Sequence, residues 1–394
     1  MKKAILLSVI YTFMIFIFSG NAADAYQQGN IKEKVVASQV PTNMTQPLSV
    51  VPRGSAARQG TEDGFMLARG IPGGLSTDRP GGAAGRIKII IDTDIAEDID
   101  DILVTAFALA SPEFEVLAIT TVDGNVAARS RVARQVTKLF GQPEIPVAEG
   151  YVQHMPLSDT TYKGFSGGVR YGEVAPDERG LPLPCPLKAD ALIAQLVERY
   201  PGEVNLLTIG SMTNVGQFLV RYPQTARKLK RIVSNGGYFR DLANQSIGWN
   251  LRYDPLAALI TSRSGVSWIV LSETTSSTAS PRREDVVRLE QAGLPSTKML
   301  VEAISWWKKN KTDATALPHV SDLNVFAYLL GMVEIEKGNV FFDMVPAGKL
   351  PGFRVEADTA GRIWFGNRIT QDKSDGLRKM FFDRLTSPPP TRGR

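Results

Sequence analysis

Six acidic residues follow a short apolar run near position 90, and they are the part of the chain best suited to chemistry. The run Ile87 to Ile91 is typical of a buried β-strand, and the next ten residues, Asp92 to Asp101, contain all six carboxyl groups. Capping of a helix N-terminus explains one or two of them, but not Asp92 and Asp94 directly after a buried strand. Two carboxylates about 4 Å apart repel by roughly 4 kcal/mol at an effective dielectric constant of about 20. Such a set stays ionised only beside a cation, or else it shares protons.

The residue types around this cluster favour a hard cation. Carboxylate oxygens suit Ca²⁺ or Mg²⁺ better than zinc. The single cysteine, Cys185, cannot form an intrachain disulfide, and a thiolate zinc site needs several cysteines. Two histidines, His154 and His319, are too few for a histidine-rich metal site. We therefore predict a metal site, with a merely solvated acidic turn as the alternative.

The elements that must position these carboxylates alternate between apolar strands and amphipathic helices. This order predicts an α/β fold, with an open, mostly parallel sheet, helices on both faces and a Rossmann-like core. Ligands of such sheets bind beyond the carboxyl ends of the strands, where the acidic cluster falls. The predicted strands are 87–91, 114–122, 145–147, 204–209, 231–234 and 267–271, and the predicted helices are 98–110, 126–140, 189–200, 214–220, 255–262 and 298–309.

Both ends of the chain differ in composition from the predicted domain, residues 86–386. Residues 1–25 have two lysines, an apolar run and a small-residue stretch ending at Ala25, which predicts a cleaved signal peptide and a periplasmic or secreted protein. A retained membrane anchor is the alternative, but the run is shorter than the roughly 20 residues that span a bilayer. Residues 26–85 lack apolar periodicity and predict a flexible low-complexity linker, and residues 387–394 predict a disordered tail.

The overall composition limits the kinds of partner that this protein is expected to bind. Hydrophobic residues make up 43% of the chain and charged residues 22%, as in globular proteins, so a wholly disordered or polytopic membrane protein is excluded. Lys and Arg number 45 against 40 Asp and Glu, a net charge of +5, which is too small an excess to indicate a nucleic-acid partner. We expect a small-molecule ligand, with no nucleic acid and no membrane contact once the signal is removed.

Five segments that follow one another along the chain give the acidic cluster a more specific interpretation. Together they resemble the inosine-uridine-preferring nucleoside hydrolase family, in a divergent secreted form with two extra residues before the paired aspartates. The first pairs Asp92-Thr93-Asp94 with Asp98-Ile99-Asp100-Asp101, and the others are Thr120-Thr121-Val122-Asp123-Gly124-Asn125-Val126, Leu207-Thr208-Ile209-Gly210-Ser211-Met212-Thr213-Asn214, Trp249-Asn250-Leu251-Arg252-Tyr253-Asp254-Pro255-Leu256-Ala257-Ala258 and His319-Val320-Ser321-Asp322-Leu323-Asn324-Val325-Phe326-Ala327-Tyr328. One such motif is weak evidence, but five in order are hard to explain by chance.

The resemblance implies hydrolysis of the N-glycosidic bond of ribonucleosides to ribose and free base. In that family one Ca²⁺ ion at the pocket floor holds the ribose 2′- and 3′-hydroxyls and the attacking water. Asp94 would also be the general base. The family is commonly oligomeric, which allows for a homo-oligomer, although no interface is indicated. The resemblance implies that the metal ligands are Asp94, Asp101, Asp322 and the main-chain carbonyl of Ile209. It also implies that Asp100 and Asn250 bind the ribose diol and that Asn125 lies close to the reacting sugar. Asp92 would orient the neighbouring groups.

Three positions depart from the family pattern. Gly248 stands where a glutamate usually binds the ribose 5′-hydroxyl, which leaves the 5′ end loosely held or admits a bulkier group; Arg252 nearby makes a 5′-phosphate conceivable. Ser321 stands where many members have a histidine as leaving-group acid, with His319 two residues earlier. Lys163 replaces the histidine of a glycine-rich loop. Base preference and the leaving-group acid therefore stay open.

Two other functions remain as alternatives. A strand ending in Asp-x-Asp also occurs in haloacid-dehalogenase-like phosphatases, with Asp92 as nucleophile, but that family expects Thr or Val where this chain has Ala96. A non-catalytic protein of the same fold that binds ribose or nucleosides would also explain the three departures. We leave open whether Trp249 lines the pocket or packs inside, and expect Trp306 and Trp307 to pack.

Overall fold

The computed structural model describes residues 85–155, 176–239, 245–275, 279–309, 311, 313, 315–343 and 352–388. The predicted signal peptide, nearly all of the predicted linker, Lys163 and residues 389–394 of the predicted tail lie outside the described residues. A search of the described part for a helix long and apolar enough to cross a bilayer finds none.

Nine strands in the described part of the chain form one sheet, in the order β3-β2-β1-β4-β5-β6-β9-β7-β8. The pairs from β3 through β6 to β9 are parallel, and β7 pairs antiparallel with β8 and β9. The strands are β1 (Ile87–Thr93), β2 (Phe114–Thr121), β3 (Val147–Glu149), β4 (Asn205–Thr208), β5 (Arg231–Asn235), β6 (Trp268–Leu271), β7 (Val333–Asp343), β8 (Gly352–Ala357) and β9 (Ile363–Ile369).

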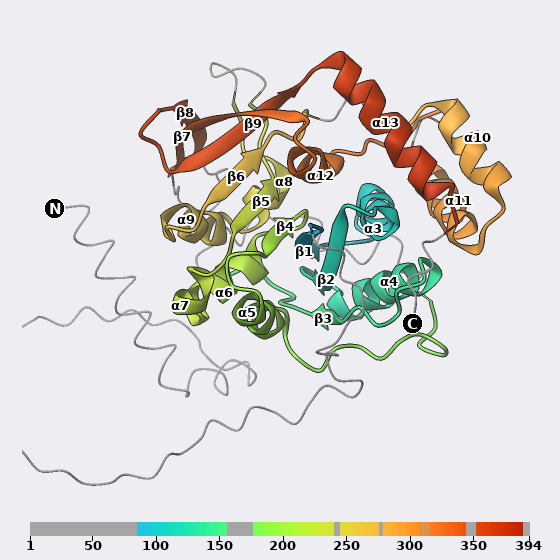
Figure 1. Ribbon diagram of the computed structural model, residues 1–394, viewed down its shortest axis with the longest axis horizontal. Coiled ribbons are helices and arrows are strands. Elements are labelled where there is room, and N and C mark those ends of the chain that lie inside the picture. The colour runs from blue at the N-terminus through green and yellow to red at the C-terminus, as the bar shows by residue number, and fades with distance from the viewer. Residues whose placement is uncertain are drawn as a thin grey trace, which may run out of the picture. The chain divides into compact units, whose positions relative to one another are not determined.

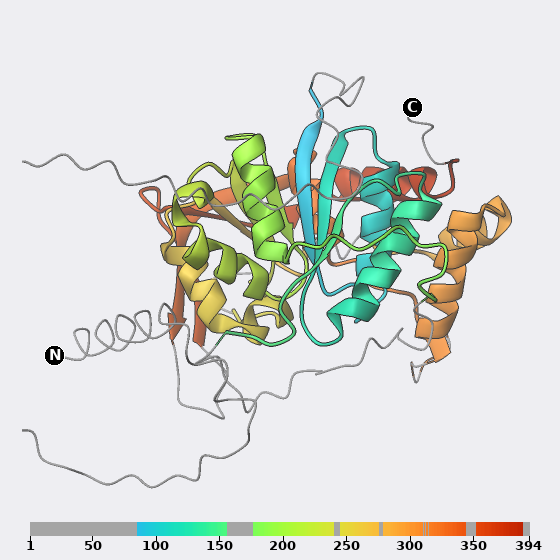
Figure 2. The same ribbon diagram turned by 90° about the horizontal axis from the view of Figure 1, so that it is seen from below.

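Helices cover both faces of this sheet (Figure 1). One apolar core lies under α3, α4, α11, α12 and α13, and a second lies under α5, α6, α7 and α9. Figure 2 shows the same helices and strands turned by 90°. The helices are α3 (Asp100–Ala110), α4 (Val126–Leu139), α5 (Ala189–Arg199), α6 (Thr213–Arg221), α7 (Pro223–Ala226), α8 (Trp249–Tyr253), α9 (Pro255–Arg263), α10 (Arg283–Ala292), α11 (Pro295–Lys309), α12 (Leu323–Leu329) and α13 (Gln371–Leu385).

Two helix starts near the carboxyl edge of the sheet are fixed by polar caps. Asn125 accepts a hydrogen bond from the main-chain N–H of Ala128 and so caps α4. Asp254 accepts from the N–H of Ala257 at the start of α9, where Pro255 occupies the first helical position and has no N–H to satisfy. The caps set where each helix leaves the sheet edge, and hence which side chains face the space above it.

The order of the strands reverses beside β1. The chain passes from β1 outward to β2 and β3, and then returns to the other side of β1 to form β4. In open parallel sheets such a switch point leaves a crevice at the carboxyl ends of the strands, because the two crossovers leave in opposite directions. The residues that follow β1 and β4 therefore border one crevice.

The predicted fold class is confirmed, with differences at the boundaries. The third strand is 147–149 rather than 145–147, and the first helix begins at Asp100 rather than Asp98. The strands after Met332 and the helices α7, α8, α10 and α13 are additions to the predicted order. Trp307 is buried in the core and Trp306 packs against it, as expected.

Candidate active site

A cavity of about 290 Å³ opens at the switch point. Its walls come from the residues that follow four parallel strands and from the starts of α3, α8 and α12. The carboxylate, amide and aromatic side chains and the strand ends that border it belong to Asp94, Glu97, Asp98, Asp100, Asp101, Ile209, Asn235, Trp249, Asn250, Tyr253, Glu273, Ser321 and Asp322.

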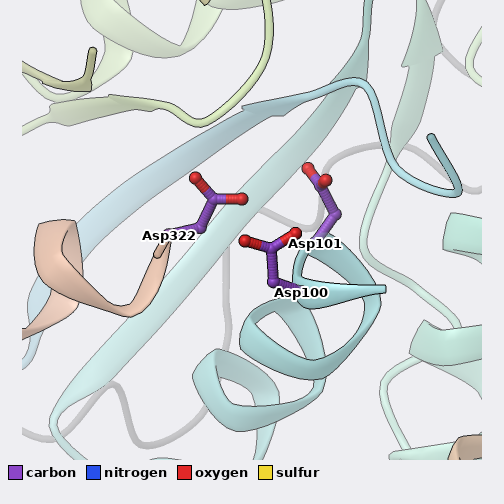
Figure 3. Close-up of side chains that lie close together, drawn as sticks. All are labelled: Asp100, Asp101 and Asp322. Atoms are coloured by element: carbon purple, nitrogen blue, oxygen red, sulfur yellow. The ribbon is translucent and has the colours of Figure 1, made fainter. Parts of the chain in front are cut away.

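Three aspartates meet at one wall of this cavity. Asp100 and Asp101 open α3, and Asp322 directly precedes α12, so residues more than 200 positions apart converge (Figure 3). One carboxylate oxygen from each lies within 4.8 Å of the other two, and all three side chains are buried. Asp94, from the end of β1, lines the same cavity. The structure thus brings the predicted ligands Asp94, Asp101 and Asp322 to one cavity, while the close carboxylate cluster itself joins Asp101 and Asp322 with Asp100, which was predicted to bind the ribose diol.

Burial sets the electrostatics of this wall. It raises the pKa of Asp94 to about 8 and that of Asp100 to about 7. Burial, followed by repulsion from the neighbouring aspartates, also raises the pKa of Asp101 and Asp322 well above the usual range. Without a cation, these neighbouring carboxyl groups resist ionisation. A divalent cation bound between their oxygen atoms would stabilise the ionised form. The donor set therefore fits a divalent metal ion.

Neighbouring hydroxyl groups fix the two aspartates of α3. The Thr93 hydroxyl donates a hydrogen bond to Asp101 Oδ1. The Ser321 hydroxyl donates to Asp100 Oδ2 at 2.8 Å. Ser321, predicted only as the replacement of a histidine, thus orients a carboxylate of the site.

An amide relay fixes the third aspartate. Asn235, the last residue of β5, donates from Nδ2 to Asp322 Oδ1 at 2.6 Å. Asn235 Oδ1 in turn accepts from Asn324 Nδ2 at 2.8 Å. Sequence reasoning gave Asn235 no role, although it ends a strand and precedes Gly236-Gly237. Such partners hold ligand carboxylates in one orientation.

Ile209 contributes its main chain rather than its side chain. Its N–H donates to the carbonyl of Asp92 at 2.9 Å, and its own carbonyl accepts from Asn250 Nδ2 at 2.9 Å. Asn250 Nδ2 also donates to the carbonyl of Asn235. A Cβ at Gly210 would lie 2.6 Å from the Asp94 nitrogen, so only glycine allows β4 to approach β1 this closely. Asn250 thus lines the cavity and orients a predicted carbonyl ligand.

Asp92 lies behind the cavity wall. It is fully buried, and its Oδ1 accepts hydrogen bonds from Thr120 at 2.5 Å and from Asn214 at 2.7 Å. Burial raises its pKa to about 7. A phosphatase of the haloacid-dehalogenase type needs this carboxylate exposed to attack a phosphoryl group, so its burial argues against that alternative.

A buried arginine holds the loop between β1 and α3. The Arg129 guanidinium donates to the carbonyls of Asp94 and Ile95, and to that of Asp123 at 2.8 Å. It also pairs with Glu97 at 3.0 Å. Ala96, inside the loop, has a φ of 75°, a backbone conformation that non-glycine residues rarely adopt. Arg129 therefore stabilises the longer loop that delivers Asp94, and sequence reasoning missed it because it lies on α4.

Asn125 and His319 lie elsewhere. Asn125 is exposed and caps α4, and neither it nor His319 is among the described residues that line the cavity. His319 is also exposed. The structure does not bring Asn125 to the aspartate wall, and its predicted place beside the sugar stays a prediction.

The wall near β6 carries Trp249, Tyr253 and Glu273. Trp249 is 38% exposed, so the question left open by the sequence is answered in favour of the cavity. Glu273 follows β6 and was not predicted, because nothing in its sequence neighbourhood marks it.

Comparison with known proteins agrees with this geometry. The sequence profile described as inosine-uridine preferring nucleoside hydrolase matches residues 89–381. Uridine nucleosidase 1 of Arabidopsis thaliana is 30% identical over 269 residues, which cover 63% of this chain and 78% of that protein. An uncharacterized protein of Schizosaccharomyces pombe and a non-specific ribonucleoside hydrolase of Salmonella newport are each 33% identical, over 47% of this chain and 60% of their own length.

Solved structures share the fold. A plant nucleoside hydrolase has a TM-score of 0.63 at 23% identity, covering 77% of this chain and 99% of that one. A purine-preferring ribonucleoside hydrolase from Gardnerella vaginalis has a TM-score of 0.61 at 21% identity, covering 76% of this chain and 99% of that one. These structural matches show the shared fold, and the profile together with the related sequences supports the enzyme class predicted from the sequence, an N-glycosidase. The profile spans all four predicted metal ligands, and the chain belongs to the inosine-uridine preferring nucleoside hydrolase family.

Proposed function

We propose that this protein hydrolyses the N-glycosidic bond of ribonucleosides to ribose and free base, at a Ca²⁺ ion held by Asp94, Asp101, Asp322 and the carbonyl of Ile209. The observation that carries the proposal is the convergence of these groups, from three distant parts of the sequence, on one cavity. A bound Ca²⁺ would hold the vicinal hydroxyls of the sugar and neutralise the carboxylates around it.

The residues of the chain supply the remaining chemistry. Asp94 takes a proton from the attacking water as its oxygen bonds to the anomeric carbon, and the electron pair of the broken C–N bond leaves with the base. The carboxylates of the wall stabilise the positive charge that develops on the sugar ring. Asp100, held by Ser321, accepts a hydrogen bond from a sugar hydroxyl, and Asn250 adds a further polar contact.

Arg129 and Asn235 act through other residues. Arg129 binds the carbonyl of Asp94 and so fixes where the loop places its carboxylate. Asn235 holds Asp322. Neither is a group that touches the reacting atoms, so both are positioning residues.

Ribose release tests this proposal. Purified protein is assayed with a panel of purine and pyrimidine nucleosides, with Ca²⁺ or with a chelator, beside Asp94→Asn. The proposal predicts release of ribose and base that needs the metal and is lost, by at least about a hundredfold, in D94N. Asp313→Asn, at an exposed site outside the cavity, is the matched control and keeps full activity.

The same assay separates the alternatives. Phosphate release from phosphorylated substrates, without ribose release, would support a phosphatase. Calorimetric binding of nucleosides without any ribose release would support a non-catalytic binding protein.

We also propose that the protein is exported after removal of residues 1–25. The basis is the charged, apolar and small-residue pattern of these residues. Expression of the full chain in a bacterial host, followed by fractionation and intact mass, tests this. The mature protein should appear outside the cytoplasm with Tyr26 at its N-terminus, whereas a full-length cytoplasmic product would contradict export.

A further inference from the structure

Glu273 places a carboxylate in the cavity on the side away from the aspartate wall. It follows β6, which lies three strands from β1 in the sheet. Neighbouring strands lie about 4.8 Å apart, so the ends of β1 and β6 are separated by roughly 14 Å. Side chains from both ends reach into a cavity of about 290 Å³, near the lower limit of small-molecule sites.

Glu273 is held by a set of donors. The N–H of Trp249 donates to Oε1 at 2.9 Å, and the N–H of Gly237 and the hydroxyl of Tyr238 also hydrogen-bond to the carboxylate. The main-chain N–H of Glu273 donates to the carbonyl of Gly237 at 3.0 Å. These contacts fix the side chain before any ligand arrives, which lowers the entropy cost of binding.

Gly248 makes room for this carboxylate. A Cβ at position 248 would overlap Glu273 Oε1 and would crowd the nitrogen of Gly237. The backbone of Gly248, with φ −77° and ψ 174°, is open to any residue, so conformation does not explain the glycine. The reason is space: a side chain at 248 and the carboxylate of Glu273 exclude each other, and the main chain at Gly237 restricts position 248 as well.

The nearby arginine does not replace this charge at the cavity surface. Arg252 stacks on Trp249, with its guanidinium carbon 4.1 Å from the ring centre, and it is not among the described cavity-lining residues. A phosphate group at this wall would meet the carboxylate of Glu273 first, and like charges repel in a partly buried site.

We propose that Glu273 binds the primary 5′-hydroxyl of a ribonucleoside, with Gly248 as the space that admits its carboxylate, and that it excludes nucleoside 5′-phosphates. This inference rests on the proposed function, in which the aspartate wall takes the 2′- and 3′-hydroxyls. The 5′-hydroxyl is then the one donor left on the sugar, and Glu273 is an acceptor at the other side of the cavity. Because the same carboxylate accepts from the main-chain N–H of Trp249, it also holds the start of α8, which carries the exposed indole.

The test compares uridine, 5′-deoxyuridine and uridine 5′-monophosphate on three proteins. These are the wild type, Glu273→Gln and the control Glu198→Gln at an exposed ion pair. A hydrogen bond to a charged group predicts that the wild type prefers uridine over 5′-deoxyuridine by about tenfold to a hundredfold in kcat/KM, and that it does not cleave the monophosphate measurably.

In E273Q this preference should fall to less than about threefold, mainly through loss on uridine. E198Q should match the wild type. A wild type that cleaves both nucleosides equally, or an E273Q that keeps the preference, would overturn the role of Glu273 while leaving the hydrolase in place. No ribose release from any nucleoside by the wild type would instead overturn the proposed function itself. Because the first comparison needs only the wild type, a variant that fails to fold does not remove the test.

Discussion

Ser321 donates a 2.8 Å hydrogen bond to Asp100 across 221 positions of sequence. The bond joins the start of α12 to the start of α3 and places two of the cavity aspartates, Asp100 and Asp322, on elements that are tied to each other. At a position where the family pattern often has a histidine, this chain uses a hydroxyl group to orient a carboxylate.

Removing this hydroxyl should weaken substrate binding. A hydrogen bond to a charged group contributes about 1.5–3 kcal/mol, so Ser321→Ala should lower kcat/KM for ribonucleosides by roughly tenfold or more. Ser321→Thr keeps the hydroxyl and should recover most of the loss. Steady-state kinetics of both variants check this, and an alanine variant as active as the wild type would show that the bond has no functional role.

Asn235 should control metal affinity. It donates to Asp322 from the end of β5, and loss of a partner of this kind costs about tenfold to a hundredfold in affinity. Calorimetric titration of chelator-treated Asn235→Ala with Ca²⁺ should show this weakening. Asn339→Ala, at an exposed bond to Asp358, is the control, and equal affinities in both variants would refute the prediction.

Arg129 should matter for stability as well as for the site. Its guanidinium is fully buried and serves three carbonyls and Glu97. Breaking a buried ion pair on one side costs about 3–5 kcal/mol, because the partner is left uncompensated. Urea unfolding of Arg129→Met should show a loss of this size, whereas Arg179→Met, at a 91% exposed side chain, should show almost none. A loss below about 1 kcal/mol in R129M would mean that the loop is held by other contacts.

The aspartate wall should make the metal-free protein less stable as pH rises. Asp94 and Asp100 have pKa values of about 8 and 7 in the folded state against a usual 3.8, so between about pH 4 and pH 8 the folded state binds more protons than the unfolded state. Stability then falls with increasing pH over this window. The melting temperature of chelator-treated protein should drop between pH 6 and pH 8.

Ca²⁺ should stabilise the folded protein more strongly as the pH rises. Protons compete with the ion for the same carboxylates, so the increase in melting temperature on adding Ca²⁺ should be larger at pH 8 than at pH 6. A stabilisation by Ca²⁺ that is independent of pH would mean that the ion binds outside this cluster.

The elements that the sequence predicted correctly are those whose residue pattern is typical of only one kind of secondary structure. The run Ile87 to Ile91 is β-branched and fully apolar apart from Lys88, and it forms the central strand β1. The later strand Val333–Asp343 mixes charged and apolar residues, because it lies in the antiparallel part of the sheet near one edge, and it was not predicted.

Some residues of the site could likewise be predicted from the sequence, and others could not. Asp94, Asp100, Asp101 and Asp322 were found because ordered motifs marked them. Glu273 was not, because its role follows from the empty space beside Gly248, which exists only in three dimensions. Asn125 is the opposite case, because its motif was recognised in the sequence but its side chain caps α4 in the structure.

A crystal structure of the protein with Ca²⁺ and ribose would show where the metal ion and the sugar bind. We predict one ion per chain, at about 2.3–2.6 Å from oxygens of Asp94, Asp101, Asp322 and the carbonyl of Ile209, and in contact with both vicinal hydroxyls of the sugar. An ion or a sugar bound away from these four groups, with the cavity at the switch point left empty, would contradict it.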